Sequence, residues 1–298
     1  MERVGVVGLG NMGLNMAKTL LRKACSVVGY DIRPSQVSQL VEAGGRQAST
    51  AQQVAEECTA VIVSLPNSPI TEEVVLGQHG ILSGVSAGSL VIDMGSSVPA
   101  STRMLGARLE EKGARMVDAP VSGGPQGAAA GSLAIIIGGA AEDIERAMPV
   151  FRLLGAEEKI TIVGALGSGH MLKAINNFVY ACCIWVCGEA FVVAAKAGLD
   201  ANIVQKVIST STARNNVVED NVPNEILNRS FPVWFALGLL NKDINTFYGI
   251  AQDLGVTIPV GAVLKEMYNL GVREIGADVG DSKIVTLLEK WARVEVRG

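Results

Sequence analysis

The sequence contains few of the residues that metal sites and nucleic-acid interfaces use. It has two histidines and five cysteines, and no two cysteines form a CxxC pair. This composition argues against a zinc site, and we predict no metal. The formal net charge of −4 gives nucleic acid and acidic membrane surfaces no bulk attraction. The odd number of cysteines is typical of reduced thiols and predicts a cytoplasmic protein.

Aromatic residues are also scarce, at 4%, whereas hydrophobic residues make up 49% of the chain. The core must therefore be aliphatic, which suits buried parallel strands packed against helices. One apolar run, residues 178–196, is long enough to suggest a membrane span. It contains Glu189 and follows Lys173, so we interpret it as a buried helix of a protein that does not enter membranes. Such a helix must be covered all round, and a second subunit could supply part of that cover, as a homodimer or homotetramer.

The first half of the chain alternates short β-branched runs with helical patterns. This order predicts a parallel sheet with helices on both faces, joined by right-handed crossovers. The expected strands are 3–8, 26–31, 60–65, 89–93, 115–118, 134–138 and 160–163, and the expected helices are 12–23, 34–43, 50–57, 70–76 and 99–112.

The second half loses the strand signal after about residue 164 and reads as helices. A long, largely apolar helix over 167–197 comes first, and Gly198 would stop it. Further helices are expected at 200–212, 215–227, 241–254, 259–271 and 281–292. We therefore predict an α/β protein with two domains. An N-terminal doubly wound Rossmann domain over 1–163 would bind a dinucleotide, and an all-helical domain over 164–298 would begin with the long helix.

A glycine-rich turn follows the first strand and opens the first helix. Its residues are Gly8, Leu9, Gly10, Asn11, Met12 and Gly13. A GxGxxG alone is a weak signal that also fits an ordinary glycine turn, but a strand–turn–helix context is typical of dinucleotide binding. Gly8 would allow the tight turn, Gly10 the approach of a pyrophosphate, and Gly13 close helix–strand packing. The helix N-terminus would favour the phosphate charge.

The end of the second strand predicts which cofactor binds. Asp31 stands 18 residues after Gly13, where a carboxylate accepts hydrogen bonds from the adenosine ribose and disfavours a 2′-phosphate. We therefore expect NAD. Arg33 could pair with that phosphate, which leaves NADP as an alternative.

Two further strand ends are candidates for the cofactor crevice. Leu65, Pro66 and Asn67 follow the third strand, and Ser96 follows the fourth. Ligands bind at the carboxyl ends of strands in open α/β sheets, although these segments would also serve as plain turns.

Two later segments carry the candidate chemistry. Asp118-Ala-Pro-Val-Ser122-Gly123-Gly124 is a small-residue loop whose amides and Ser122 hydroxyl could bind a carboxylate, or a plain tight turn. Lys173 and Asn177 are four residues apart at the start of the long helix and share a face. A buried lysine there can act as an acid/base, whereas a solvated first-turn lysine would do nothing. His170 is more simply a structural histidine.

Four motifs together resemble the β-hydroxyacid dehydrogenase family, which includes 3-hydroxyisobutyrate dehydrogenase and tartronate semialdehyde reductase. They are Gly8–Gly13, Asp118–Gly124, Gly167–Asn177 (GSGHMLKAINN) and Lys242-Asp243. They occur in the family's order and cover essentially the whole chain.

The resemblance implies hydride transfer between NAD and a short β-hydroxy acid. Lys173 matches the catalytic lysine that exchanges a proton with the substrate oxygen, and Asn177 the polar residue beside it. Ser122, Gly123 and Gly124 match the loop that holds the substrate carboxylate. The other positions match residues around the pocket: Ser96 and Lys242 at the cofactor, and Phe235 and Asp243 at the substrate.

Departures from the family pattern leave the substrate open. The loop 94–97 is Met-Gly-Ser-Ser, and Trp234 is bulky enough to narrow the pocket. Asn176-Asn177 resembles 3-hydroxyisobutyrate dehydrogenase, whereas the tail 288–296 resembles tartronate semialdehyde reductase. Two other functions are alternatives. One is an imine reductase, although the similar imine reductases replace the lysine; the other is a catalytically silent cofactor-binding module.

Overall fold

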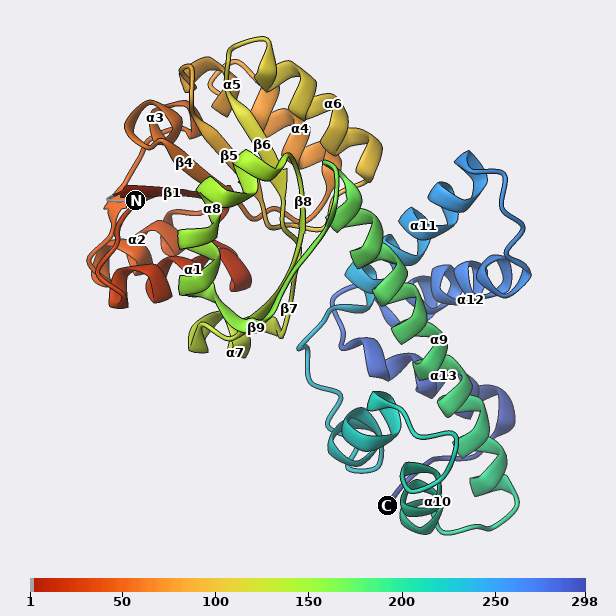
Figure 1. The fold of residues 1–298 in the computed structure, drawn as a ribbon. Helices are drawn as coiled ribbons and strands as arrows, with labels where there is room; N and C mark the ends of the chain where they lie inside the picture. The colour runs from red at the N-terminus through yellow and green to blue at the C-terminus, as the bar shows by residue number, and fades with distance from the viewer. Residues whose placement is uncertain (1–2) are drawn as a thin grey trace. The chain divides into compact units, whose positions relative to one another are not determined.

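The computed structural model describes residues 3–298 and contains two compact units (Figure 1). One unit reaches to Lys173 and the other spans Ala174–Gly298. The domain boundary that the sequence suggests after residue 163 stays a prediction.

The first unit is built on one sheet of nine strands in the order β3-β2-β1-β4-β5-β6-β8-β7, with β9 also paired to β8. Pairing is parallel from β3 to β6 and antiparallel where β8 meets β6 and β7. The strands are β1 (Arg3–Val7), β2 (Ser26–Tyr30), β3 (Arg46–Gln47), β4 (Ala60–Val63), β5 (Leu90–Asp93), β6 (Arg115–Asp118), β7 (Val121–Ser122), β8 (Leu133–Gly138) and β9 (Gly155–Gly164).

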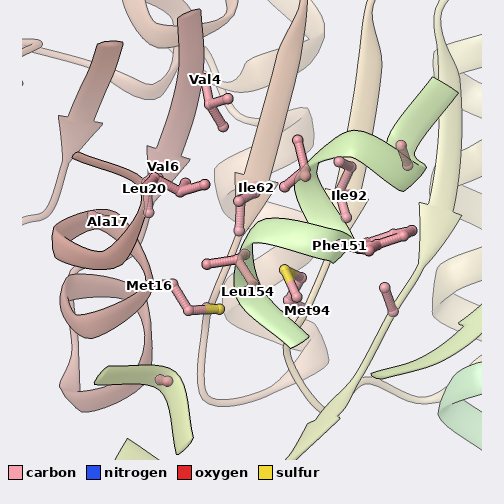
Figure 2. Close-up of a cluster of buried hydrophobic side chains, with 14 of the residues drawn as sticks. Val4, Val6, Met16, Ala17, Leu20, Ile62, Ile92, Met94, Phe151 and Leu154 are labelled. Carbon is pink, nitrogen blue, oxygen red and sulfur yellow. The ribbon is translucent and has the colours of Figure 1, made fainter. Parts of the chain in front are cut away.

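Helices cover both faces of this sheet, as the βαβ order predicts. They are α1 (Asn11–Arg22), α2 (Pro34–Glu42), α3 (Ala51–Glu57), α4 (Ser68–Leu76), α5 (Ile81–Gly84), α6 (Pro99–Glu110), α7 (Gly124–Ala130) and α8 (Ala141–Leu154). Figure 2 shows α1 and α8 packing on one face, where Leu20 and Phe151 lie over Val6 and Ile92. On the other face, alternate strand residues such as Val61 pack with side chains of α3 to α6. The doubly wound Rossmann fold is confirmed.

The second unit is helical, also as predicted. The long helix α9 (Ser168–Lys196) starts just before it. The rest is α10 (Ala201–Ser209), a π-helix η1 (Val217–Ile226), α11 (Leu237–Asp253), α12 (Pro259–Ile275), a 3₁₀ turn η2 (Asp281–Ile284) and α13 (Val285–Ala292). Helix α9 is long and apolar enough to cross a membrane. The core helix of a globular protein can have the same length and composition, so this one helix is weak evidence for a membrane span.

The structure contains elements that the sequence patterns did not predict. Helix α8 fills the interval between β8 and β9 and has Pro149 inside it, a residue that usually interrupts helices. The supposed loop after β6 contains β7 and α7. Strands of two residues, such as β3 and β7, are too short for a periodicity to show.

Candidate active site

The glycine turn between β1 and α1 has the backbone that close packing requires. Gly8 has φ +90°, and a Cβ there would overlap the Ser64 carbonyl oxygen. A Cβ on Gly13 would overlap the Gly8 carbonyl oxygen, so helix and strand approach too closely for any side chain. At Gly10 the nearest atom would be an Arg33 guanidinium nitrogen, 3.6 Å away. Gly10 is the N-cap of α1 and, within residues 3–298, no side chain caps it, so the first amides of α1 suit a phosphate.

Asp31 follows β2 and is fixed by neighbours on both sides. Its Oδ2 accepts the Leu9 N–H at 2.8 Å, while the Arg33 guanidinium donates to both carboxylate oxygens at 3.0 and 3.1 Å. Burial raises the pKa of Asp31, but the hydrogen bonds from Arg33 and Leu9 outweigh it and lower the pKa overall. The carboxylate is therefore ionised and pre-oriented beside the glycine turn.

A pocket of about 220 Å³ adjoins Asp31. Residues of β2, α2 and the segment at β3 line it, among them Tyr30, Pro34, Val37, Gln47 and Ser49. No sequence motif marks these residues, although the turn after the second strand indicates the region. The pocket mixes apolar walls with polar edges. Together with the uncapped turn and the carboxylate, it fits the adenosine part of a dinucleotide.

The ends of β4, β5 and β6 carry polar groups with local roles. Asn67 caps α4, because its Oδ1 accepts the Ile70 N–H at 3.0 Å. Ser96 follows Gly95, whose N–H donates to Asp93 at 2.9 Å. Ser122 lies in β7. The next two residues, Gly123 and Gly124, have φ of +120° and +60°, a backbone that favours glycine.

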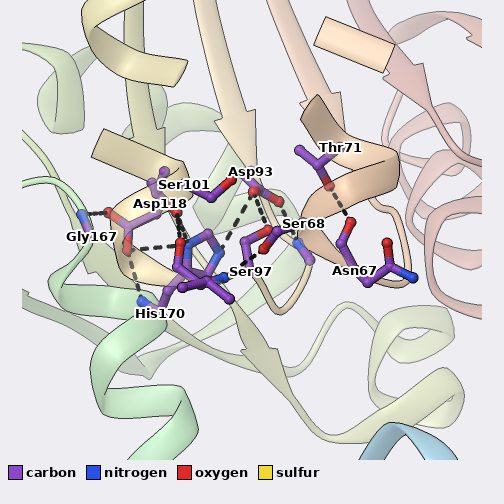
Figure 3. A network of polar contacts seen from close by, with 12 residues as sticks. Asn67, Ser68, Thr71, Asp93, Ser97, Ser101, Asp118, Gly167 and His170 are labelled. Atoms are coloured by element: carbon purple, nitrogen blue, oxygen red, sulfur yellow. Dashed lines mark hydrogen bonds and ion pairs between the residues drawn. The ribbon is translucent and has the colours of Figure 1, made fainter. Parts of the chain in front are cut away.

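A buried network joins the ends of β5 and β6 to the start of α9 (Figure 3). The Asp118 carboxylate accepts the backbone N–H groups of Gly167 and His170, both at 2.7 Å. His170 Nδ1 lies 2.7 Å from the Thr102 hydroxyl of α6. Lys173, three residues after His170, therefore stands on a helix whose first turn is anchored to the carboxyl edge of the sheet.

In the second unit, Asn177 and Asp243 meet. Asn177 Nδ2 donates to Asp243 Oδ2 at 2.5 Å, and both residues are buried. The Lys242 ammonium lies 2.9 Å from the other Asp243 oxygen. The structure thus joins α9 and α11 through three of the predicted site residues.

Phe235, the predicted pocket aromatic, precedes α11 and packs against the hydrophobic core of the second unit. Its carbonyl accepts the Asp281 N–H at 3.0 Å. The pKa of Asp281 is raised to about 7, mainly by burial; the charge of Glu225 adds to the rise, and a hydrogen bond with Tyr180 opposes it. No sequence pattern marks Tyr180, Glu225 or Asp281, since isolated polar residues that become buried have no motif of their own.

Comparisons with known proteins assign this arrangement to a family. A family model for the NAD-binding domain of 6-phosphogluconate dehydrogenase matches residues 3–167. A second one, for the NAD-binding region of NADP-dependent 3-hydroxyisobutyrate dehydrogenase, matches residues 167–288. The chain is 33% identical to 2-(hydroxymethyl)glutarate dehydrogenase of Eubacterium barkeri, covering 99% of this chain and 98% of the relative. The chain belongs to the β-hydroxyacid dehydrogenase family.

Other members resemble this β-hydroxyacid dehydrogenase over nearly their full length. The 2-hydroxy-3-oxopropionate reductase of Escherichia coli is 32% identical, over 97% of this chain and 98% of the relative. The structure of Mycobacterium tuberculosis 3-hydroxyisobutyrate dehydrogenase with L-serine has a TM-score of 0.88 at 30% identity, over 97% and 99% of the two chains. The predicted activity class, an NAD-linked dehydrogenase acting on CH–OH groups of small carboxylic acids, is confirmed.

The imine reductase alternative receives no comparable support. The imine reductase of Myxococcus stipitatus matches with a TM-score of 0.66 and 15% identity, which shows a shared fold alone. The same comparisons oppose a catalytically silent module, because the relatives that match nearly the whole chain are enzymes.

Proposed function

We propose that this dehydrogenase transfers hydride between NAD and a short β-hydroxy acid of the 3-hydroxyisobutyrate or tartronate semialdehyde type, with Lys173 as the acid/base. The observation that carries the proposal is the anchored first turn of α9. Asp118 fixes the amides of Gly167 and His170 at the carboxyl edge of the sheet, and cofactors of open α/β sheets bind at that edge.

The proposed cofactor site uses the first unit. The amides at the start of α1 bind the pyrophosphate, and Asp31 accepts the ribose hydroxyls. The 220 Å³ pocket takes the adenosine. Residues 65–67 and Ser96 follow strands that end at the same edge, and the family resemblance adds Lys242 as a further cofactor contact. NAD is preferred because Asp31 is ionised and Arg33 is engaged with it.

In the proposed substrate site, different residues contact the carboxylate, the hydroxyl and the apolar part of the substrate. The Ser122 hydroxyl and the amides of Gly123 and Gly124 hold the substrate carboxylate. Asn177, oriented by Asp243, donates to the substrate hydroxyl, and Phe235 forms an apolar wall.

When bound, the nicotinamide supplies the hydride acceptor. Lys173 removes the hydroxyl proton as the carbonyl forms and returns it in the reverse direction. Such general acid–base help contributes about 10² to 10⁴ in rate.

A substrate panel tests this function. Purified protein is assayed with 3-hydroxyisobutyrate, glycerate, L-serine, 2-(hydroxymethyl)glutarate, 3-sulfolactaldehyde and a cyclic imine, each with both cofactors in the matching redox state. We expect the highest kcat/KM for one short 3-hydroxy acid, with NAD. Turnover of cyclic imines but of no hydroxy acid would contradict the proposal.

We also propose that the protein is a homodimer or a larger homo-oligomer. Three valines seven residues apart on α9, Val179, Val186 and Val193, are 54%, 55% and 67% exposed. A seven-residue apolar repeat on an exposed helix suits a partner helix. We expect light scattering to give at least a dimer, and Val186→Glu to shift it toward monomer. Val41→Glu, at another exposed helical valine, should leave the mass unchanged.

For location we propose the cytoplasm. All five cysteines are free, as is usual in a reducing compartment. Fractionation of the source cells checks this, and recovery from an oxidising compartment would contradict it.

A further inference from the structure

The ring of His170 lies between two carboxylates that end neighbouring strands. Asp93 and Asp118 are directly paired in the parallel register of β5 and β6, and both are 0% exposed. His170 Nε2 is 3.8 Å from Asp93 Oδ2, and Nδ1 is 3.7 Å from Asp118 Oδ2. Its side chain is itself fully buried. One imidazole is thus within 4 Å of both acids.

Two adjacent carboxylates buried from water repel each other and lose hydration. Asp93 accepts the Gly95 N–H and the Ser97 hydroxyl, and Asp118 accepts two backbone N–H groups. All four donors are neutral. Burial raises the pKa of Asp118, and positive charge on His170 opposes that rise. Arg103 of α6 is another cation near this site, since it adjoins Gly167, but Arg103 is exposed and water screens its charge. A proton on the buried imidazole would relieve the repulsion best.

The hydrogen bonds around the ring favour that proton. The Thr102 hydroxyl lies 3.2 Å from the Val98 carbonyl, which can only accept, and 2.7 Å from His170 Nδ1. If the hydroxyl donates to Val98, Nδ1 must carry the hydrogen that Thr102 accepts. Nε2 has no hydrogen-bond partner among residues 3–298 and faces Asp93. A bare lone pair there would point at a negative charge, so Nε2 also favours a hydrogen.

We propose that His170 is a positioning residue for Lys173: as an imidazolium held between Asp93 and Asp118, it fastens the first turn of α9 to the ends of β5 and β6. The backbone of His170 donates to Asp118 while its ring neutralises one of the two carboxylates. Gly169 allows this contact, because a Cβ there would stand 2.9 Å from Asp118 Oδ2.

The inference rests on the proposed role of Lys173, which stands one turn further along the same helix. Residues three apart on a helix are neighbours, with Cβ atoms about 5–6 Å apart. The charge of His170 therefore acts on the Lys173 ammonium and lowers its proton affinity. Losing that charge should misplace Lys173 and raise the pH at which it gives up its proton.

The protonation state can be read directly, because the chain has only two histidines, His79 and His170. Nitrogen-15 NMR of the imidazoles is recorded from about pH 6 to pH 9, with His79→Gln for assignment. The exposed His79 serves as the internal reference in the same spectra. Both ring nitrogens of His170 should stay protonated at pH 7. A neutral His170 ring at pH 7 would overturn the inference without any activity assay.

The positioning role is tested by His170→Gln, with His79→Gln as the matched control. We expect His170→Gln to lower kcat by about tenfold to a hundredfold. KM should change little, and the pH–rate limb that reports Lys173 should move up by about one unit. A lower Tm with kcat and the pH limb unchanged would mean that His170 only stabilises the fold. If His170→Gln does not fold, Thr102→Val is the milder variant. It removes the hydroxyl that is hydrogen-bonded to His170 Nδ1 and should lower kcat several-fold.

The two proposals fail separately. Full activity of Lys173→Ala would remove the proposed acid/base but leave the NMR result on His170 standing. A neutral His170 together with an inactive Lys173→Ala would overturn only the present inference.

Discussion

The side-chain amide of Asn177 donates to the Asp243 carboxylate with 2.5 Å between Nδ2 and Oδ2, and both residues are buried. Asn177→Ala leaves that carboxylate oxygen without this donor. We expect a loss of about 1–3 kcal/mol in the free energy of unfolding, since a buried acceptor loses one of its donors. Urea unfolding measures it. Asn176→Ala removes only the 3.1 Å hydrogen bond from the Asn176 amide to Asn177 Oδ1 and should cost less than Asn177→Ala. Equal losses would show that the contact with Asp243 adds no stability.

Alanine substitutions at Gly10 and Gly13 should affect different properties of the protein. A Cβ at Gly10 would meet no atom closer than 3.6 Å, whereas one at Gly13 would overlap the Gly8 carbonyl. We expect Gly10→Ala to keep its Tm but to weaken NADH binding at least tenfold by blocking the phosphate, about 1.4 kcal/mol. Gly13→Ala should lower Tm. Fluorescence titration and thermal unfolding separate these outcomes, and unchanged NADH binding by Gly10→Ala would contradict the pyrophosphate site.

The bidentate pair of Arg33 with Asp31 predicts how cofactor preference changes. Asp31→Ser removes the ribose acceptor and releases Arg33 for a 2′-phosphate. We expect the NAD-to-NADP ratio of kcat/KM to fall about tenfold to a hundredfold, the effect of one charged hydrogen bond. Arg33→Ala alone should not improve NADP use. If Asp31→Ser left the ratio unchanged, another residue would set the preference.

The buried Asp281 predicts a dependence of stability on pH. Its pKa is raised from an ordinary 3.8 to about 7, so the folded protein binds more protons than the unfolded chain between these values. The stabilisation by protonated Asp281 is therefore present at low pH and lost as pH rises from about 4 to about 7, by at most roughly 4 kcal/mol. Asp281→Asn should lack this loss.

Urea unfolding at several pH values measures the difference between wild type and Asp281→Asn. Asp278→Asn, at an exposed position, is the matched control and should follow wild type. Parallel pH curves for wild type and Asp281→Asn would mean that Asp281 is not the group responsible.

Sequence patterns predicted the fold where hydrophobic periodicity or glycine decides the structure. The β-branched runs of β1, β4 and β5 and the apolar length of α9 became the elements expected. Helix α8 did not, because Pro149 usually breaks a helix and here tertiary packing against the sheet outweighs it. The π-helix at 217–226 also has no sequence signature that would separate it from the α-helix expected there.

In the candidate site, too, sequence motifs predicted some features and missed others. Motifs placed Asp31 at the end of the second strand and Lys173 on the long helix, where they occur, whereas Ser122 was expected in a loop and lies in β7. The contacts that orient them depend on residues far apart in sequence. The bonds of His170 to Thr102 and Asp118 span 68 and 52 residues. Single-residue patterns carry no information on such pairs, so His170 gave only the expectation of a structural histidine.

We infer above all that Lys173 exchanges the proton while the first unit holds NAD. The most direct measurement is the single-turnover rate of hydride transfer in Lys173→Ala, together with its NADH dissociation constant. We expect a rate lower by about 10² to 10⁴ and a dissociation constant close to that of wild type. Hydride transfer at the wild-type rate in Lys173→Ala would contradict it.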